Sequence, residues 1–429
     1  MGIVSRTYWG EAVGVAGNSD LLRRDPDFRR YWIARMISLG GSMVTYVALP
    51  VLVYRVTGSN LWTGLVAVAE GLPYLCFGLI AGAFADRADR QRVMVVADLG
   101  SAAVLASLPV AYAMGRLTAP HILLAALAAQ TLFVFFDTAN AGALPAVAGR
   151  DRLPVANSAL TGGGTVIEVT VPGLVGALLV VVAPAPLIIL DVLSFVASAL
   201  LIRQIVGNLR ATAPAERRHL VAEIGDGLRF LFGHRLVRML TVIGALTSVS
   251  VAAFMSQLVP WMDQVLGIRP SGDWRFAAMW VVMSLGGLAG SVMFPAVARR
   301  LDASRVALLF VPASAVCAAA CALFTLWWAA ALAGGIWYVA YMITALSTLT
   351  LRQQVTPDRL QSRVNATARM LVFGLGWPAG ALLGGVLSQA YGPSVALWAA
   401  AATLAVTAIL AWGGSLRTVR PGELVPVRD

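Results

Sequence analysis

Long apolar stretches separated by short polar segments occupy most of the chain. A hydrocarbon core about 30 Å thick is crossed by roughly 20 apolar residues in a helix. Twelve stretches reach that length, at residues 31–55, 61–85, 93–115, 119–143, 155–182, 185–206, 238–262, 275–298, 305–325, 327–350, 364–389 and 393–414. Because these stretches are continuously apolar, the pattern predicts an all-α membrane protein with twelve transmembrane helices.

The composition supports a membrane protein independently of the pattern. Hydrophobic residues make up 59% of the chain and charged residues 12%, whereas a soluble domain has about 25% charged residues. The mean hydropathy is +0.79. Most of the surface must therefore face either the lipid bilayer or other helices, and we expect a multi-pass protein of the cell membrane.

The positive charge is unevenly distributed between the two sides of the predicted helices. All 32 basic residues are arginines, and most of them lie in the two tails and in the loops that follow even-numbered helices. Those on the other side are Arg55, Arg116, Arg269 and Arg275. By the positive-inside rule, both termini are expected to be cytoplasmic. The arginines are too scattered to form a nucleic-acid-binding patch, so we expect no nucleic-acid partner.

The two halves of the chain resemble each other. An offset of about 210 residues places Asp89 on Asp302 and Arg92 on Arg305, and it places Pro50 near Pro260. Such a repeat predicts two parallel six-helix halves with a substrate path between them. The predicted divisions are an N-terminal tail (1–30), an N-terminal half (31–206), a linker (207–237), a C-terminal half (238–414) and a C-terminal tail (415–429).

The linker carries a helical pattern of its own. Leu220, Ile224, Leu228 and Leu231 recur at helical spacing, with polar residues between them. This spacing predicts an amphipathic helix on the cytoplasmic surface. The helix can serve as a tether between the halves or as a docking site for a partner.

A short loop rich in arginine and aspartate follows the second predicted helix, in the run GAFADRADRQRV. This run resembles the signature loop of the major facilitator superfamily, in which a glycine precedes an Asp-Arg pair and further arginines. The matching residues are Gly82, Asp86, Arg87, Arg90 and Arg92. Two positions depart from the signature, because Asp89 replaces its central glycine and Gln91 replaces an arginine.

Longer segments narrow the resemblance to one branch of the superfamily. Residues 28–59, 135–147 and 352–366 are similar to the branch that contains the enterobactin exporter and the macrolide efflux proteins. The resemblance implies a secondary exporter of small, bulky and partly apolar molecules, driven by an ion gradient through alternating access. We expect protons as the coupling ion, a monomer, and no cofactor. In the fifth helix Val171 precedes Pro172, which weakens the match to the drug–proton antiporters.

The signature loop suggests a gate rather than a catalytic site. Acidic and arginine side chains at the cytoplasmic mouth can hold two helices together in one state and release them in another. Asp137, near the cytoplasmic end of the fourth helix, is the expected partner of a loop arginine, and Asp98 is placed in the same cluster. The alternative is that the loop charges are only solvated and follow the topology rule.

Two carboxylates lie deep within predicted helices. Glu70 and Glu168 each fall in the middle third of a helix, where an ionisable group is costly and is a functional candidate by default. Because burial favours the neutral form of a carboxyl group, both are candidates for proton coupling. The alternative is that they face a structural partner or a wet pocket.

Aromatic and polar residues of the seventh and tenth helices suggest a binding cavity. Gln257, Trp337, Tyr338 and Tyr341 are the candidates for lining it, since aromatic faces with polar tips suit a bulky amphipathic ligand. Aromatic residues near helix ends can instead be interfacial anchors, an interpretation that fits Trp261, Trp327 and Trp328 better.

The residue inventory argues against an enzyme. The histidines are His121, His219 and His234, at a helix end and in the linker, and no lysine is available for a phosphate-binding loop. The cysteines Cys76, Cys317 and Cys321 lie in predicted helices without histidine neighbours, so we expect packing roles and no metal site. The remaining alternatives to export are solute uptake by the same fold and a membrane receptor that does not transport.

Overall fold

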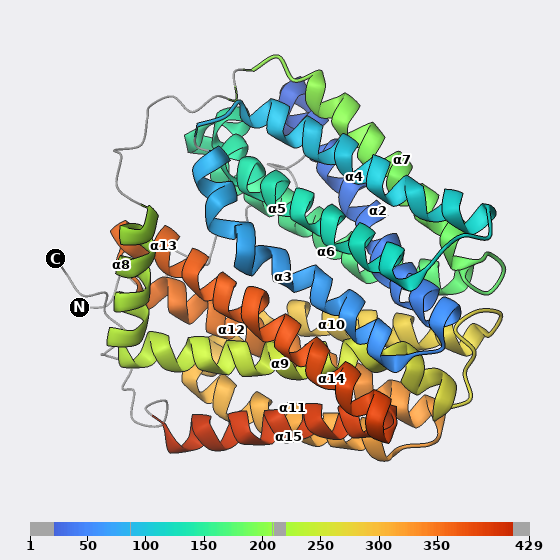
Figure 1. Cartoon of the computed structure of the whole chain (residues 1–429). Helices are drawn as coiled ribbons and strands as arrows, with labels where there is room; N and C mark the ends of the chain where they lie inside the picture. The colour runs from blue at the N-terminus through green and yellow to red at the C-terminus, as the bar shows by residue number, and fades with distance from the viewer. Residues whose placement is uncertain (1–20, 86, 208, 210–219, 415–429) are drawn as a thin grey trace.

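The structure, a computed structural model, describes residues 21–85, 87–207, 209 and 220–414, which are almost entirely helical (Figure 1). The first group of long helices comprises α2 (Pro26–Thr57), α3 (Asn60–Ala85), α4 (Arg90–Ala113), α5 (Ala119–Ala148), α6 (Leu153–Leu178) and α7 (Pro184–Arg203). The second comprises α9 (Arg235–Gln264), α10 (Trp274–Arg300), α11 (Ala303–Leu323), α12 (Trp327–Val355), α13 (Asp358–Arg369) with α14 (Trp377–Tyr391), and α15 (Pro393–Gly413). Shorter elements are η1 (Arg150–Arg152), α8 (Leu220–Gly233) in the linker, and the π-helical η2 (Met370–Gly376), which joins α13 to α14.

The predicted fold class is confirmed. In the described part of the chain, eleven helical segments are long and apolar enough to cross a membrane, with α13 through α14 contributing one of them. The remaining long helix is α6, whose three consecutive glycines, Gly162 to Gly164, and whose Glu168 lower its hydropathy. The molecule is an all-α membrane protein with two six-helix halves.

Local sequence signals set where the helices begin and end. Asp25 caps α2 by accepting a hydrogen bond from the Phe28 backbone at 3.0 Å, and Gly58 ends that helix with φ +62°. Asp89 caps α4 by accepting from the Arg92 backbone at 3.2 Å. Short polar side chains at the N-cap and a left-handed glycine after the last turn are the favoured signals. They account for the tight turns between neighbouring helices.

The two halves meet along two helix pairs. α3 packs against α14, and α6 packs against α10, with each half lying as a separate bundle in Figure 1. A Cβ atom on Gly64 of α3 would lie 2.7 Å from the Cα of Gly385 in α14, and one on Gly176 of α6 would lie 2.8 Å from the Cα of Ala277 in α10. Small residues therefore allow the backbones of the halves to approach closely, as is common between membrane helices.

The buried apolar core differs between the two ends of the molecule. We call the end with the turn between α3 and α4 the motif end, and the other the opposite end. Towards the opposite end one cluster of buried side chains includes residues of both halves, among them Val53, Leu258 and Trp261. At the motif end one cluster contains Phe28 and Met94 of the first half, and a separate cluster belongs to the second half. Among the described residues, the buried clusters that the halves share therefore lie towards the opposite end and the middle of the helices.

Hydrogen bonds between the halves follow the same asymmetry. At the opposite end, Tyr54 donates to Asp263 at 2.8 Å and Gln264 donates to the Asn60 side chain at 2.8 Å. The Ser59 hydroxyl also bonds Gln389 at 2.9 Å. Among the described residues, the polar contact between halves nearest the motif end is the one made by Arg369. The opposite end is therefore sealed, and the motif end is open in comparison.

Candidate functional site

A cavity of about 440 Å³ lies within the second half, towards the motif end. Its walls come from α9, α12 and the α13–η2 segment. The lining residues are Ile243, Gly244, Thr247, Ser248, Tyr341, Thr344, Ala345, Leu346, Thr348, Leu349, Arg352, Gln353, Asn365, Ala368, Arg369, Val372 and Phe373. We call this space the main cavity. Its volume is in the range typical of sites for small organic ligands.

The main cavity grades from apolar to charged along α12. Tyr341 lies farthest from the motif end, Thr344 and Thr348 follow one turn apart, and Arg352 lies in the last turn of the helix. On the facing segment, Phe373 lies deeper than Arg369. A ligand in this space would therefore meet aromatic carbon at the inner end and guanidinium groups nearer the motif end.

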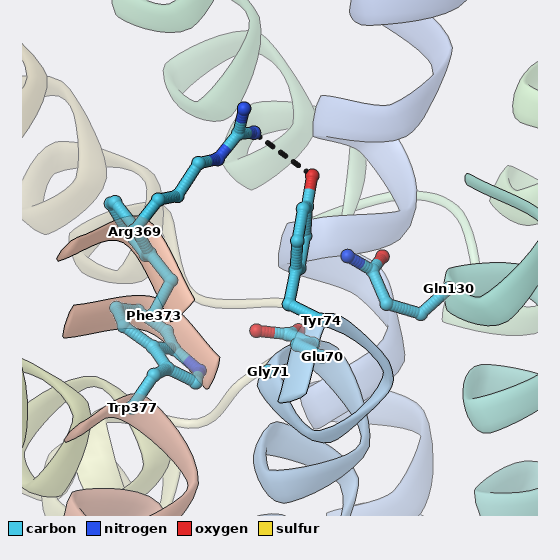
Figure 2. Close-up of a pocket in the computed structure, with 7 residues that line it drawn as sticks. All are labelled: Glu70, Gly71, Tyr74, Gln130, Arg369, Phe373 and Trp377. Carbon is cyan, nitrogen blue, oxygen red and sulfur yellow. Dashed lines mark hydrogen bonds between the residues drawn. The ribbon is translucent and has the colours of Figure 1, made fainter. Parts of the chain in front are cut away.

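A second, smaller cavity of about 250 Å³ lies between the halves. Figure 2 shows its lining, which consists of Glu70, Gly71, Tyr74, Gln130, Arg369, Phe373 and Trp377. Glu70 and Tyr74 come from α3 and Gln130 from α5, whereas Trp377 comes from α14. Arg369 and Phe373 line both cavities, so the interface between halves and the main cavity share a wall.

Arg369 connects the two halves through polar contacts. Its Nη2 lies 2.9 Å from Oδ2 of Asp137 and donates to the Tyr74 hydroxyl at 3.0 Å. The guanidinium carbon lies 4.9 Å from the centre of the Tyr74 ring, and the Tyr74 hydroxyl in turn donates to Asp137 at 3.3 Å. The three side chains form one cluster with members on both halves. Opposite charges, a shared hydroxyl and an aromatic face all favour this arrangement.

The described part of the signature loop packs against its own half. Arg90 donates through Nη1 to the Gly142 carbonyl of α5 at 2.8 Å, and its guanidinium rests where a Cβ of Gly142 would be. Arg87 is exposed, as is Arg92, whose side chain pairs with Asp89 at 3.6 Å. Gly82 lies in α3 with open space beside it. Asp86 lies outside the described residues.

One loop residue that the sequence did not single out has a clear role. Gln91, which stands where the signature carries an arginine, donates through Nε2 to the carbonyls of Ile202 at 2.8 Å and Ile205 at 2.9 Å. These carbonyls belong to the end of α7 and the residues just after it, where backbone acceptors lack helical partners. A neutral amide therefore ties the start of α4 to the end of α7.

The two aspartates expected beside the loop lie apart from its described residues. Asp137 pairs with Arg369 of the other half instead of a described loop arginine. Asp98 is 1% exposed inside the first half, close enough to Arg35 and Asp191 for electrostatic interaction. The structure does not bring Asp98 and Asp137 together with the described loop residues in one cluster.

The two candidate proton-coupling carboxylates occupy different surroundings. Glu70 lines the smaller cavity, and its side chain points towards Trp377 and Phe373 (Figure 2). Glu168 is exposed, yet it shares a face of α6 with Pro172 and Val175, which are buried. The side chain thus lies at an exposed point of a largely buried face of α6.

The four candidates for cavity lining divide into two groups. Tyr341 lines the main cavity, and Tyr338 contacts it with the two rings tilted and their centres 5.7 Å apart. Gln257 is 0% exposed and donates to the Asn60 carbonyl at 3.2 Å, so it belongs to the seal at the opposite end. Trp337 is buried against Phe254 with ring centres 4.6 Å apart. Neither Gln257 nor Trp337 lines the two cavities described above, because each points into a packed helix interface.

Comparison with known proteins places the chain among membrane transporters. The model of the transmembrane secretion effector family (MFS_3) matches residues 22–428. The multidrug efflux pump Tap of Mycobacterium tuberculosis is 28% identical over 418 residues, which are 92% of this chain and 94% of the pump. The enterobactin exporter EntS of Shigella boydii is 23% identical over 368 residues, covering 81% and 82% of the two chains.

Solved structures show the same fold. A bacterial homologue of the iron transporter ferroportin in its inward-facing state superimposes with a TM-score of 0.71 at 15% sequence identity. The superposition covers 90% of this chain and 98% of that one.

Proposed function

The chain belongs to the transmembrane secretion effector family of the major facilitator superfamily, and on this premise we propose that it exports small organic molecules across the cytoplasmic membrane by alternating access. The substrate is bulky and partly apolar, and an inward proton flux drives its export. This activity is transport and involves no chemical change of the substrate.

The asymmetry between the two ends of the molecule carries this proposal. The halves share a buried core and hydrogen bonds towards the opposite end, while their cores are separate at the motif end, next to the main cavity. A transporter that works by alternating access needs one such state and a second state, in which the motif end is sealed and the opposite end is open. Two relatives are named as exporters, which favours export over uptake.

The gate at the motif end is assigned to the signature loop together with the Arg369 cluster. Closing this end requires the halves to approach each other, and Asp137 and Arg369 already join them there. Arg87 in the turn after α3 and Arg90 at the start of α4 stand where they can hold the closed state, and Asp86, which precedes Arg87 in the sequence, is assigned the same role. The contact made by Arg90 to Gly142 fixes the position of α4 against α5.

Glu168 is proposed as the proton carrier, with Glu70 as the competing candidate. The Glu168 side chain is exposed in this state. In the proposed cycle, closure of the motif end encloses the same side chain between the halves, where burial raises the free energy of its charged form. A group that moves between a wet and a dry surrounding can take up and release a proton in each cycle. Moving that proton down the membrane potential supplies about 2.3 kcal/mol per 100 mV.

Everted membrane vesicles provide the direct test. In everted vesicles the cytoplasmic face of the membrane is outside, so an exporter accumulates an added fluorescent drug when respiration makes the lumen acidic. We expect accumulation that a protonophore abolishes. Membranes without the protein and membranes carrying Asp137→Asn serve as controls. Accumulation in right-side-out vesicles instead would establish uptake and refute the proposal.

The orientation is testable separately. The arginine distribution favours a cytoplasmic position for both tails and the linker. A reporter enzyme that is active only outside the cytoplasm, fused after Arg420, should be inactive. Activity of that fusion would show that the C-terminal tail lies outside the cytoplasm and would contradict the proposed membrane topology.

A further inference from the structure

We propose that the substrate of the main cavity is an organic anion, whose acidic group binds Arg352 and Arg369 while its apolar body lies against Tyr341 and Phe373. This inference rests on the proposed transport function and names the chemical class that the transporter carries. The acid is a carboxylate, sulfonate or similar group on a largely aromatic or aliphatic frame.

The charges in the cavity wall have one sign. Among the described lining residues, those with a formal charge are Arg352 and Arg369, and none is an aspartate or a glutamate. Asp137 contacts Arg369 but does not line the main cavity. A cation would therefore meet two guanidinium groups and no carboxylate in this space, whereas an anion would meet complementary charge.

Arg352 has no acidic partner in the described part of the chain. Its Nε donates to the Asn365 side chain at 3.3 Å, a neutral acceptor. The side chain is only partly exposed, and it lies in the wall of the cavity. A guanidinium group held in a partly apolar cavity without a counter-ion is stabilised by any anion that enters.

Arg369 also keeps donors for a ligand. Its Nη2 serves both Tyr74 and Asp137. Its Nη1 and Nε make no hydrogen bond to any residue that the structure describes. A planar guanidinium group can bind one carboxylate on one edge and a second anion on another. An anion in the main cavity can therefore contact Arg369 without first breaking the pair with Asp137.

Two hydroxyl groups offer further polar contacts. Thr247 and Ser248 of α9 line the cavity at 7% and 6% exposure, and their oxygen atoms have no hydrogen-bond partner among the described residues. Buried hydroxyls are normally bonded, so unbonded ones in a cavity wall indicate a ligand or water. They sit on the helix that faces α12, so an acid or an amide of the substrate can reach them.

The positive-inside rule does not account for Arg352. An arginine that only follows this rule needs to be on the cytoplasmic side and needs no particular contacts. Arg299 in the last turn of α10 is an example, since its side chain is exposed and lines neither cavity. Arg352 has the same place in its helix, the last turn of α12, but is turned into the cavity. Arg299 therefore provides a matched control for the loss of one positive charge.

Two dyes with the same ring system test the proposal. The probe 8-anilino-1-naphthalenesulfonate carries a sulfonate, and N-phenyl-1-naphthylamine lacks it. Binding is measured by fluorescence with the full chain in nanodiscs of zwitterionic lipid, after subtracting the signal of empty nanodiscs. We expect Arg352→Gln to weaken binding of the sulfonate by about tenfold or more, which corresponds to loss of one charge-assisted contact. Arg352→Lys should retain part of the affinity, and Arg299→Gln should retain all of it.

The uncharged dye distinguishes loss of the charge contact from loss of the fold. Its affinity should change less than about twofold in Arg352→Gln, because it uses only the apolar wall. Equal affinities of both dyes, or a sulfonate affinity that Arg352→Gln leaves unchanged, would overturn the proposal. Displacement of the sulfonate by added phosphatidylglycerol would assign the arginines to lipid headgroups and also overturn it. Because no gradient is present, failure of drug export in vesicles would leave this binding result intact.

Discussion

Asp137 and Arg369 belong to different halves of the molecule, and their charged groups lie 2.9 Å apart. Asp137 comes from α5 and Arg369 from the last residue of α13, immediately before the π-helical segment. Tyr74 of α3 contacts both of them. The pair therefore links the interface between the halves to the wall of the main cavity, which Arg369 also lines.

Removing one charge of this pair should impair transport more than stability. Arg369 is 51% exposed and Asp137 19%, so the pair contributes about 1 kcal/mol or less to folding. We expect Asp137→Asn to lower transport about tenfold or more while the melting temperature in detergent falls by only a few degrees. The interchange Asp137→Arg with Arg369→Asp should recover part of the activity. If each single variant transports normally, the pair has no part in the cycle.

Two arginines of the same loop should behave differently. Arg90 is packed on Gly142 and bonded to its carbonyl, whereas Arg92 is 80% exposed and pairs only with Asp89 among the described residues. Arg90→Ala should reduce turnover strongly at normal expression, and Arg92→Ala should reduce it less than about twofold. Asp86→Asn is expected to act like Arg90→Ala. Equal effects of Arg90→Ala and Arg92→Ala would indicate that the loop charges are only solvated and follow the positive-inside rule.

Glu168→Gln should uncouple transport from the proton gradient. The amide keeps the shape of the side chain but cannot bind and release a proton. Transport driven by a pH gradient should be lost, while counterflow exchange of labelled for unlabelled substrate continues. Glu70→Gln is the comparison that decides which acid carries the proton. Accumulation in Glu168→Gln vesicles at the rate of the unchanged protein would make this carboxylate structural.

A glycine at the interface between the halves should control which end is open. A Cβ on Gly64 would lie 2.7 Å from the Cα of Gly385 and 2.9 Å from the Ala381 carbonyl oxygen, so Gly64→Ala pushes α3 away from α14. We expect increased labelling of Ser59→Cys at the opposite end by a membrane-impermeant thiol reagent. Gly78→Ala in the same helix is the control, because a Cβ there meets nothing within 4 Å. Unchanged labelling would show that the seal tolerates the displacement.

The loop before α10 should lose its capping interaction in acid. Asp273 caps this helix and accepts hydrogen bonds from Arg275, which lowers the pKa of its carboxyl group below the ordinary value of 3.8. A lowered folded-state pKa gives stability that is complete above the unfolded pKa and is lost as the pH falls through the folded value. Asp273→Asn should therefore lower the melting temperature at pH 7. The two proteins should converge once the pH falls below the folded-state pKa, where the carboxyl is protonated in both states.

The membrane architecture could be predicted from the sequence because lipid imposes a one-dimensional rule. Any span must be long, apolar and helical, so even α6, with its glycines and Glu168, is recognisable among its neighbours. The repeat in the sequence likewise predicts two equivalent halves. Chain order alone then indicates which helices border the centre.

The contacts between the halves could not be predicted in the same way. The sequence makes Gln257 and Trp337 candidates for lining the cavity, but helical spacing does not show that their faces are packed against other helices. The partner of Asp137 lies more than two hundred residues away, at Arg369, and their contact depends on how closely the halves approach. A signal was nevertheless present, since an arginine within an apolar span requires a partner.

The π-helical segment explains how three side chains of the eleventh span can face one neighbour. Arg369, Phe373 and Trp377 are four residues apart, and all three line the smaller cavity against α3. In a regular α-helix each four-residue step rotates the side chain by about 40°, so the third would have turned well away from the first. The wider turn of Met370–Gly376 offsets that rotation. The π-helical turn thus keeps the three side chains on one face of the span. Shortening the segment by one residue would rotate Trp377 and the rest of α14 out of register with α3.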